Sequence, residues 1–217
     1  MYDLNKSQIM ELFQFDNAAK VISAAYVASS SGNVQTGDVV HLSFPGSNGD
    51  CHVKSGHINN AESYVIKIAS GFYDNPSKGL PSSNGMMLAF SASTGEPKAI
   101  LRDEGWLTDM RTGIGGAVAT KALAAKNAEK VLIIGSGIQA QFQAKCLASL
   151  MPERPFNFNI WGRNTSAAAA LAEELRGYNL NADVAKNLDE EVPLADIIIT
   201  TTPATSSLFG DNLVRPG

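Results

Sequence analysis

The chain has 217 residues, and its 17 basic and 21 acidic side chains give a formal net charge of −4 at pH 7. This balance provides no basic field for a phosphate backbone, so we expect no nucleic-acid partner. Hydrophobic residues make up 44% of the chain and charged residues 18%, which is typical of a folded globular protein and excludes a disordered one. No apolar run approaches the roughly 20 residues of a membrane helix, so we expect no membrane partner.

The N-terminus and the cysteines bear on location. The first residues lack the basic head and apolar centre of a signal peptide. Cys51 and Cys146 lie far apart without a C-x-x-C spacing, which favours free thiols in a reducing compartment. We therefore expect a cytoplasmic protein.

Residues 1–125 predict an α+β domain. A helix is expected over 16–29, with Asp16 capping its free amides. Short strands are expected at 39–44, 51–56, 64–69, 86–91 and 98–101, with a hairpin turn at 93–96. A second helix over 108–124 contains Gly113, Gly115 and Gly116. Each interior glycine costs about 1 kcal/mol of helix propensity, so we expect another backbone to approach closely there.

Residues 126–217 alternate between strand and helix. The continuous apolar run 130–134 is typical of a strand buried on both faces. A helix at 138–150, a strand at 156–161, a helix at 165–175, a weak strand at 182–185 and a strand at 196–201 follow. This pattern predicts an α/β fold with a Rossmann-type, doubly wound parallel sheet, joined to the N-terminal α+β domain.

A glycine-rich loop connects the first strand and helix of this second half. Its residues match the pattern G-x-G-x-x-A and are Gly135, Ser136, Gly137, Ile138, Gln139 and Ala140. Glycines at these positions let the backbone approach a pyrophosphate, which then lies against the helix N-terminus. The alternative is an ordinary strand-to-helix turn, and the flanking strand and helix favour the dinucleotide site.

The residues after the second strand bear on cofactor choice. A carboxylate there would bind the adenosine ribose hydroxyls and repel a 2′-phosphate. This chain has Arg163 and Asn164 instead, which favours NADP(H) over NAD(H), although an exposed arginine without a role is the alternative. Thr202, after the last strand, is a further candidate cofactor contact.

Together with two upstream segments, the loop resembles the ornithine cyclodeaminase/mu-crystallin family. The segments are 64–76 (YVIKIASGFYDNP) and 107–113 (LTDMRTG), and the similarity extends over roughly residues 3–217. The resemblance implies a domain for substrate binding and dimerisation, a Rossmann domain and a homodimer. It also implies hydride transfer at the α-carbon of an amino or imino acid, as a cyclodeaminase, ketimine reductase or amino-acid dehydrogenase.

Two cations are candidate substrate and catalytic residues. Lys67 lies in an apolar strand, and its family position helps to hold the substrate carboxylate; the alternative is a strand-edge lysine that hinders aggregation. Arg111 is expected in the first helical turn, where its guanidinium and free amides would converge on one anion. A surface pair with Asp109 is the alternative. The family's R-T-A/G motif also makes Thr112 a cofactor contact.

Other positions depart from the family pattern. Lys54 stands near the place of a Met-Pro pair, and His41 near that of a missing arginine. We expect Lys54 to contribute to a partly rebuilt carboxylate site, and Asn84 to be a second substrate-binding candidate or a structural turn residue. The histidines lack metal-ligand spacing, so we expect no metal.

Two alternatives to an enzyme of this family stay open. One is a crystallin-like protein that binds NADPH and a small ligand without turnover; the other is a shikimate-dehydrogenase-like enzyme, against which the glycine-rich helix argues. The family's catalytic aspartate would fall beyond residue 217, so we expect a truncated member with little catalysis unless Asp74 or Asp109 supplies the acid. We also expect the last strand to leave Ile197, Ile198 and Ile199 poorly covered.

Overall fold

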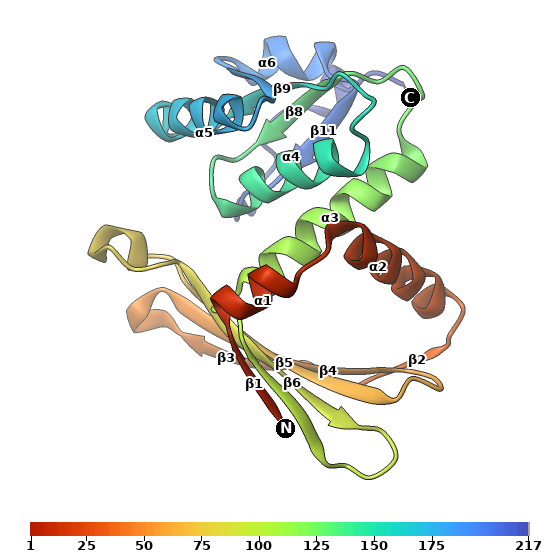
Figure 1. Ribbon diagram of the computed structural model, residues 1–217. Coiled ribbons are helices and arrows are strands. Elements are labelled where there is room, and N and C mark those ends of the chain that lie inside the picture. The colour runs from red at the N-terminus through yellow and green to blue at the C-terminus, as the bar shows by residue number, and fades with distance from the viewer. Residues whose placement is uncertain (217) are drawn as a thin grey trace. The chain divides into compact units, whose positions relative to one another are not determined.

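The computed structural model describes residues 1–216 and divides into two compact units (Figure 1). Unit 1 is Met1–Thr108 and unit 2 is Asp109–Gly217. The division falls inside the helix α3 (Trp106–Leu123), whereas the sequence placed it after residue 125. Most of α3 groups with unit 2 because its glycines pack against a helix of that unit, as described below.

Unit 1 is built on a seven-stranded sheet with the order β1-β7-β6-β5-β4-β2, in which β3 also pairs with β4. Its pairs are antiparallel except for the parallel pair of β1 and β7. The five strands expected from sequence are all present, whereas β1 and β2 were missed because they are short. The strands are β1 (Tyr2–Asn5), β2 (Val34–Thr36), β3 (Val40–Phe44), β4 (Gly49–Ile58), β5 (Ser63–Phe72), β6 (Ser83–Ser91) and β7 (Pro97–Arg102).

Two helices, α1 (Lys6–Leu12) and α2 (Phe15–Ser30), precede β2 in the chain. Asn5 begins α1 with a capping box that it shares with Gln8. The expected cap of α2 is wrong: α2 begins one residue before Asp16, and its N-cap is Gln14, which forms no side-chain cap. Asp16 instead lies in the first turn, where a negative charge favours the helix dipole.

The unit 1 sheet has one apolar and one polar face, because successive side chains of a strand point to opposite sides. On β3, Val40, Leu42 and Phe44 alternate with His41 and Ser43. Register extends the apolar face from β3 to β6, whereas the opposite face is polar mainly on β3 and β4 and carries Val65, Ala69 and Met87 farther across. The apolar face comprises Val40, Leu42, Phe44, Cys51, Val53, Ile66, Ile68, Met86 and Leu88, and the polar face includes His41, Asp50, His52, Lys54 and Lys67.

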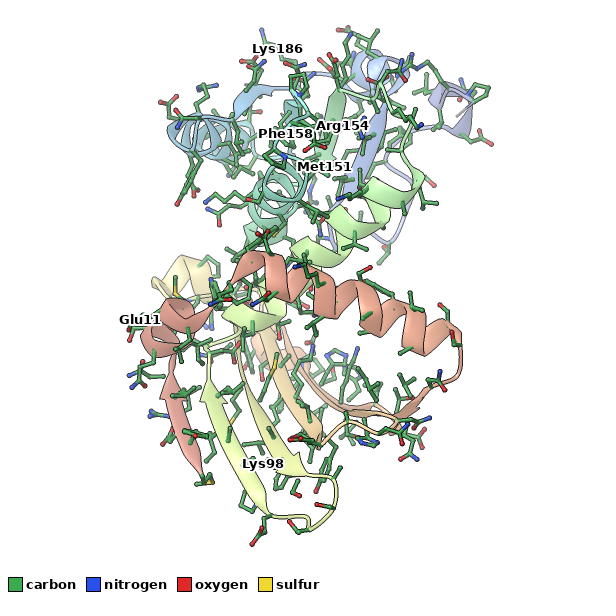
Figure 2. The ribbon with its side chains drawn as sticks, turned by 45° about the vertical axis from the view of Figure 1, so that its right-hand side comes forward. Glu11, Lys98, Met151, Arg154, Phe158 and Lys186 are labelled. Carbon is green, nitrogen blue, oxygen red and sulfur yellow. The ribbon has the colours of Figure 1, made fainter. Side chains whose placement is uncertain are left out.

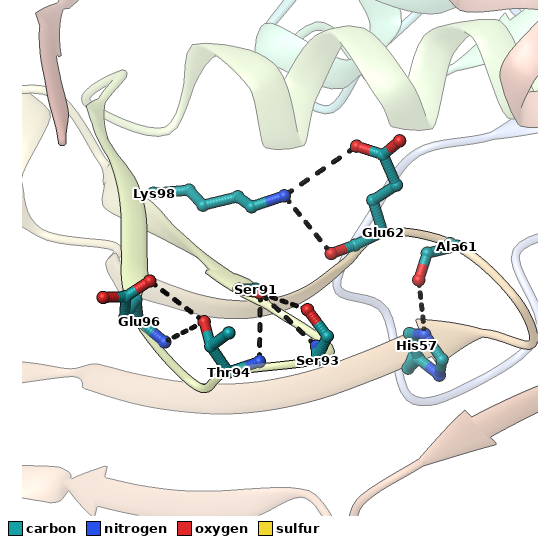
Figure 3. Close-up of polar contacts among 8 residues, drawn as sticks. All are labelled: His57, Ala61, Glu62, Ser91, Ser93, Thr94, Glu96 and Lys98. Atoms are coloured by element: carbon teal, nitrogen blue, oxygen red, sulfur yellow. Dashed lines mark hydrogen bonds and ion pairs between the residues drawn. The ribbon is translucent and has the colours of Figure 1, made fainter.

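The turn between β6 and β7 confirms the predicted hairpin. Gly95 has a φ of 74°, in the left-handed region that favours glycine. The Ser91 hydroxyl accepts hydrogen bonds from the amides of Ser93 (3.3 Å) and Thr94 (3.2 Å). Figure 3 shows these contacts, together with the Thr94 hydroxyl donating to Glu96. The polar groups of this tight turn are therefore satisfied locally.

Unit 2 contains a parallel four-stranded sheet in the order β10-β9-β8-β11. This is the predicted Rossmann-type arrangement, in which the short α6 was not expected. The strands are β8 (Lys130–Ile134), β9 (Asn157–Trp161), β10 (Asn181–Val184) and β11 (Ile197–Thr200). The helices after α3 are α4 (Ile138–Leu150), α5 (Thr165–Gly177) and α6 (Leu188–Glu191).

The core of unit 2 is continuous across its central strands. The apolar residues of β8 are at most 2% exposed, and Phe158 of β9 is 1% exposed. Figure 2 labels Phe158 with Met151 and Arg154. The Arg154 guanidinium donates to the carbonyls of Ala125 (2.8 Å) and Ala128 (2.6 Å), so it satisfies backbone groups just before β8.

The glycines of α3 confirm the expected close approach. A Cβ at Gly113 would lie 2.7 Å from the Phe142 carbonyl oxygen and 2.8 Å from the Cys146 sulfur, both on α4. A Cβ at Gly116 would clash with the side chain of Gln143. The small residues therefore let α3 and α4 pack closely.

The expected poor coverage of β11 is wrong for two of its three isoleucines. Ile197 is 9% exposed, and Ile198 packs against a buried cluster that contains Leu132 and Ile134. Leu208, Phe209 and Leu213, from the segment after β11, pack on the same cluster. The chain beyond the strand thus folds back and supplies apolar cover that the strand pattern alone does not reveal.

Candidate functional site

The glycine-rich loop has the geometry that its sequence predicts. Gly135 follows β8 and has a φ of 129°, and its amide donates to the Trp161 carbonyl over 2.7 Å. A Cβ at this position would clash with the Thr201 hydroxyl and lie 2.9 Å from the Thr201 carbonyl oxygen. Gly135 is therefore required both by its backbone conformation and by the adjacent chain.

The second glycine of the loop exposes the start of a helix. Gly137 is the N-cap of α4 and provides no capping side chain, and the first turn of α4 contains no acidic residue. A Cβ on Gly137 would meet no atom within 4 Å. The positive end of the helix dipole thus faces open space, as an anion-binding backbone requires.

A cavity of about 570 Å³ lies at the carboxyl ends of β8, β9 and β11. In open α/β sheets, ligands bind in the crevice outside the carboxyl ends of the strands. Its lining residues come from three loops of unit 2 and include the predicted Gly135, Ser136, Gly137, Arg163, Asn164 and Thr202. Ile138, Gln139 and Ala140 are not among the lining residues, and Ala140 is fully buried.

The polar side chains of this cavity differ in what they already bind. Arg163 is exposed. Asn164 caps α5, and its side-chain oxygen accepts from the Ala167 amide over 3.1 Å. The Thr202 hydroxyl accepts from the Ala204 amide over 3.3 Å. Asn164 and Thr202 therefore shape their loops, whatever else they contact.

Gln139 makes a contact that sequence reasoning missed. Its side-chain amide donates to the Asp109 carboxylate over 2.7 Å, across 30 positions of sequence. A second glutamine of α4, Gln143, donates to the Thr112 carbonyl over 3.1 Å. These two contacts join α4 to the part of α3 that contains Arg111 and Thr112. No local sequence pattern predicts either contact.

Arg111 does not lie where it was expected. The helix α3 begins at Trp106, two residues earlier than predicted, so Arg111 lies in the second turn rather than the first. At the actual start, Asp103 accepts from the Leu107 amide over 2.8 Å through its side chain and from the Trp106 amide through its carbonyl. The predicted convergence of the guanidinium with free helix amides is therefore wrong, although Arg111 is exposed on α3.

The structure brings Lys54 and Lys67 together and separates them from Asn84. Lys54 and Lys67 are direct register partners on β4 and β5. Lys67 is half-buried on a strand with neighbours on both sides, so the strand-edge alternative is wrong. Asn84 pairs with Ser70, which places it on the opposite face of the sheet.

Two histidines extend the polar face beside the lysines. The rings of His41 and His52 stack with centroids 4.6 Å apart. Asp50 lies 3.5 Å from His52 Nδ1 and accepts from the Tyr73 hydroxyl over 3.0 Å. Burial, and then the hydrogen bond to Asp50, raises the pKa of Tyr73. This part of the polar face therefore carries lysine and histidine side chains, with the carboxylate of Asp50 at its end.

Metal and membrane sites find no support in residues 1–216. Within that range no group of three histidine, cysteine, aspartate or glutamate side chains could hold a metal ion. No helix of the same range has both the length and the apolarity to span a bilayer. Cys51 and Cys146 are free thiols.

Comparisons with known proteins identify the relatives. The sequence profile of the ornithine cyclodeaminase/mu-crystallin family matches residues 3–217. An uncharacterized cyclodeaminase of Sinorhizobium fredii is 37% identical over 217 residues, which are 99% of this chain and 65% of that relative. The chain therefore spans about two thirds of the length of this curated relative.

Two solved structures share the fold at 26% identity. Δ(1)-Pyrroline-2-carboxylate reductase from Thermococcus litoralis, in complex with NADH and L-proline, has a TM-score of 0.89 over 99% of this chain and 66% of that one. An archaeal alanine dehydrogenase dimer with bound NAD has a TM-score of 0.85 over 99% of this chain and 64% of that one.

Proposed function

The chain belongs to the ornithine cyclodeaminase/mu-crystallin family, and from this premise we propose that it binds a nicotinamide dinucleotide and serves hydride transfer at the α-carbon of an amino or imino acid. The observation that carries the proposal is the open space above Gly137 at the start of α4. The related reductase and alanine dehydrogenase structures contain NADH and NAD, which supports the same class of cofactor here.

The residues present fit such a cofactor. Gly135 permits the tight turn after β8, Gly137 leaves the backbone accessible, and the first amides of α4 would hold the pyrophosphate. Ser136 and Arg163 line the same cavity. The bound nicotinamide would supply the hydride donor or acceptor, while the protein binds and orients both partners.

The family resemblance implies that Lys67 and Arg111 each contribute to substrate binding, and we retain both as candidates. A guanidinium can bind a carboxylate through two parallel hydrogen bonds, and an ammonium such as that of Lys67 can bind one as a point charge. Fixing the carboxylate orients the α-carbon, and positioning of this kind can remove roughly 7–11 kcal/mol of a reaction barrier. Thr112 is retained as a cofactor contact and Asn84 as a weaker substrate candidate.

We further propose a preference for NADP(H), because Arg163 stands where a ribose-binding carboxylate is usual. A charge-assisted contact with the 2′-phosphate contributes about 1.5–3 kcal/mol. In titrations of both cofactors, Arg163→Ala should lower NADPH affinity and leave NADH affinity unchanged. The matched control is Lys186→Ala, which removes an exposed cation outside the cavity. Equal loss for both cofactors would contradict the assignment.

A homodimer in the cytoplasm is the assembly we propose. Val40, Leu42 and Phe44 are 53%, 50% and 41% exposed on the apolar face of unit 1, and a contiguous apolar patch favours an interface. The related alanine dehydrogenase is a dimer. Sedimentation of the wild type and of Leu42→Ser would test this, because the polar substitution should shift the equilibrium toward monomer.

The central experiment combines binding and turnover. Gly137→Val should abolish measurable NADPH binding, because its side chain fills the open space, while the melting temperature stays close to that of the wild type. The matched control is Gly46→Val, another position where an added Cβ meets nothing within 4 Å. Unchanged affinity in Gly137→Val would refute the cofactor site.

Turnover is then measured at the nicotinamide absorbance band with amino acids and cyclic imines, using both cofactors. Turnover that is lost in Lys67→Ala and Arg111→Ala supports hydride transfer. Tight NADPH binding without any turnover would instead favour the crystallin-like binding protein.

A further inference from the structure

The pairing of Lys54 with Lys67 is unusual for an antiparallel sheet. The two residues are direct partners on neighbouring strands, so their side chains leave the same face roughly 5 Å apart at Cβ. Like charges in this arrangement destabilise a sheet. Lys54 is exposed, and no hydrogen bond or ion pair joins it to a described residue.

The sheet provides no acidic residue in the adjacent register positions. On the polar face the neighbours of the pair are Gly56 with Val65 on one side, and His52 with Ala69 on the other. The next residue across from Lys67 is Met87. Asp50, two rows away, already accepts from Tyr73 and lies beside His52. The register positions next to the lysines therefore carry no carboxylate, and the stacked rings of His41 and His52 lie farther along the same face.

We propose that Lys54 binds a second anionic group of the substrate, so that the protein takes acidic amino or imino acids with two carboxylates. The inference rests on the proposed function, in which Lys67 binds the first carboxylate. A dicarboxylate that is bound at Lys67 can place its second negative charge at Lys54, the exposed register partner of Lys67. A diamino acid would bring a cation against Lys54 and is selected against by the same charge.

Calorimetric titration of the NADPH-loaded protein tests this with three probes: L-aspartate, L-alanine and L-ornithine. We expect aspartate to bind at least about tenfold more tightly than alanine, and ornithine to bind most weakly. Lys54→Met should remove the advantage of aspartate and leave alanine within about twofold. The matched control is Lys20→Met, which removes an exposed lysine of α2. Circular dichroism confirms that each variant is folded.

Charge reversal sharpens the test, since Lys54→Glu should bind ornithine better than aspartate. Equal affinities for aspartate and alanine in the wild type, an unchanged ratio in Lys54→Met, or no binding of any probe would overturn the inference. Aspartate binding that depends on Lys54 without nicotinamide oxidation or reduction would refute hydride transfer and leave this subsite intact. Turnover of alanine with no preference for aspartate would refute the subsite and leave hydride transfer intact.

Discussion

The two sheets of this protein differ in how completely they are covered. In unit 2, the four apolar residues of β8 are at most 2% exposed. In unit 1, every residue of the central strand β5 is half-buried or exposed, and the buried residues of the whole unit are Ile9, Ala19, Ser91, Asp103 and Gly105. A parallel sheet with connecting helices encloses its own core, whereas an antiparallel sheet can leave a face open.

This difference means that the two units are stabilised in different ways. Unit 2 has a self-contained core, which holds the geometry of the glycine-rich loop 135–140. The sheet of unit 1 has an apolar face and an opposite polar face. Its charged side chains are accessible, and few of its residues are buried. We infer that the stability of unit 2 comes from its interior, while that of unit 1 depends on what covers the apolar face.

The largest expected effect compares one substitution in the two sheets. Ile133→Ala removes a fully buried side chain of β8 and should cost about 3–4 kcal/mol of unfolding free energy. Ile66→Ala, at a half-buried position of β5, should cost about 1 kcal/mol because less apolar surface returns to water. Denaturant unfolding monitored by circular dichroism measures both.

Equal losses of unfolding free energy in the two variants would contradict the expectation that Ile66 is less buried than Ile133. They would indicate that the apolar face of unit 1 is covered in solution, and the loss in Ile66→Ala would then depend on protein concentration. Repeating the unfolding at two concentrations distinguishes the cases.

The same contrast explains what could be predicted from sequence. The helix at 138–150 was predicted at the bounds that α4 has, and the glycine loop marks its start. The strands β1 and β2 have four and three residues, too few for a periodic pattern. The start of α3 was placed late because Asp103, the residue that caps it, lies beyond the expected boundary.

Candidate site residues follow the same rule. The glycines of the loop act through their own backbone, so the local motif was enough to find them. The contact of Gln139 with Asp109 and the pairing of Lys54 with Lys67 depend on packing and register between distant segments, which no single segment encodes. Hydrogen-bond partners and facing residues therefore had to come from the structure.

A second, smaller effect tests the glycine packing within unit 2. Gly113→Ala should cost about 1–3 kcal/mol, because its Cβ would press on the Phe142 carbonyl and Cys146 of α4. Gly177→Ala, at the end of α5 where a Cβ meets nothing within 4 Å, should be neutral or stabilise by about 0.4–1 kcal/mol. Thermal unfolding measures both, and a stable Gly113→Ala would mean that α3 and α4 separate at no cost.

The smallest effect is a pH dependence at Asp196, just before β11. The backbone amides of Lys130 and Glu129, and then Arg215, hold the pKa of this carboxyl below its ordinary value. The amides lie 2.9 and 3.0 Å from one oxygen, and Arg215 lies 2.9 Å from the other. A lowered pKa in the folded state contributes stability above the unfolded pKa, and this stability is lost as the pH falls through the folded value.

Asp196→Asn should therefore be less stable than the wild type at pH 7, and the difference should shrink below about pH 4. Asp3→Asn, which breaks only an exposed pair with Arg102 in unit 1, is the control and should change stability by less than about 1 kcal/mol. A gap between wild type and Asp196→Asn that stays constant down to pH 3 would show that these amides do not prefer the charged carboxylate.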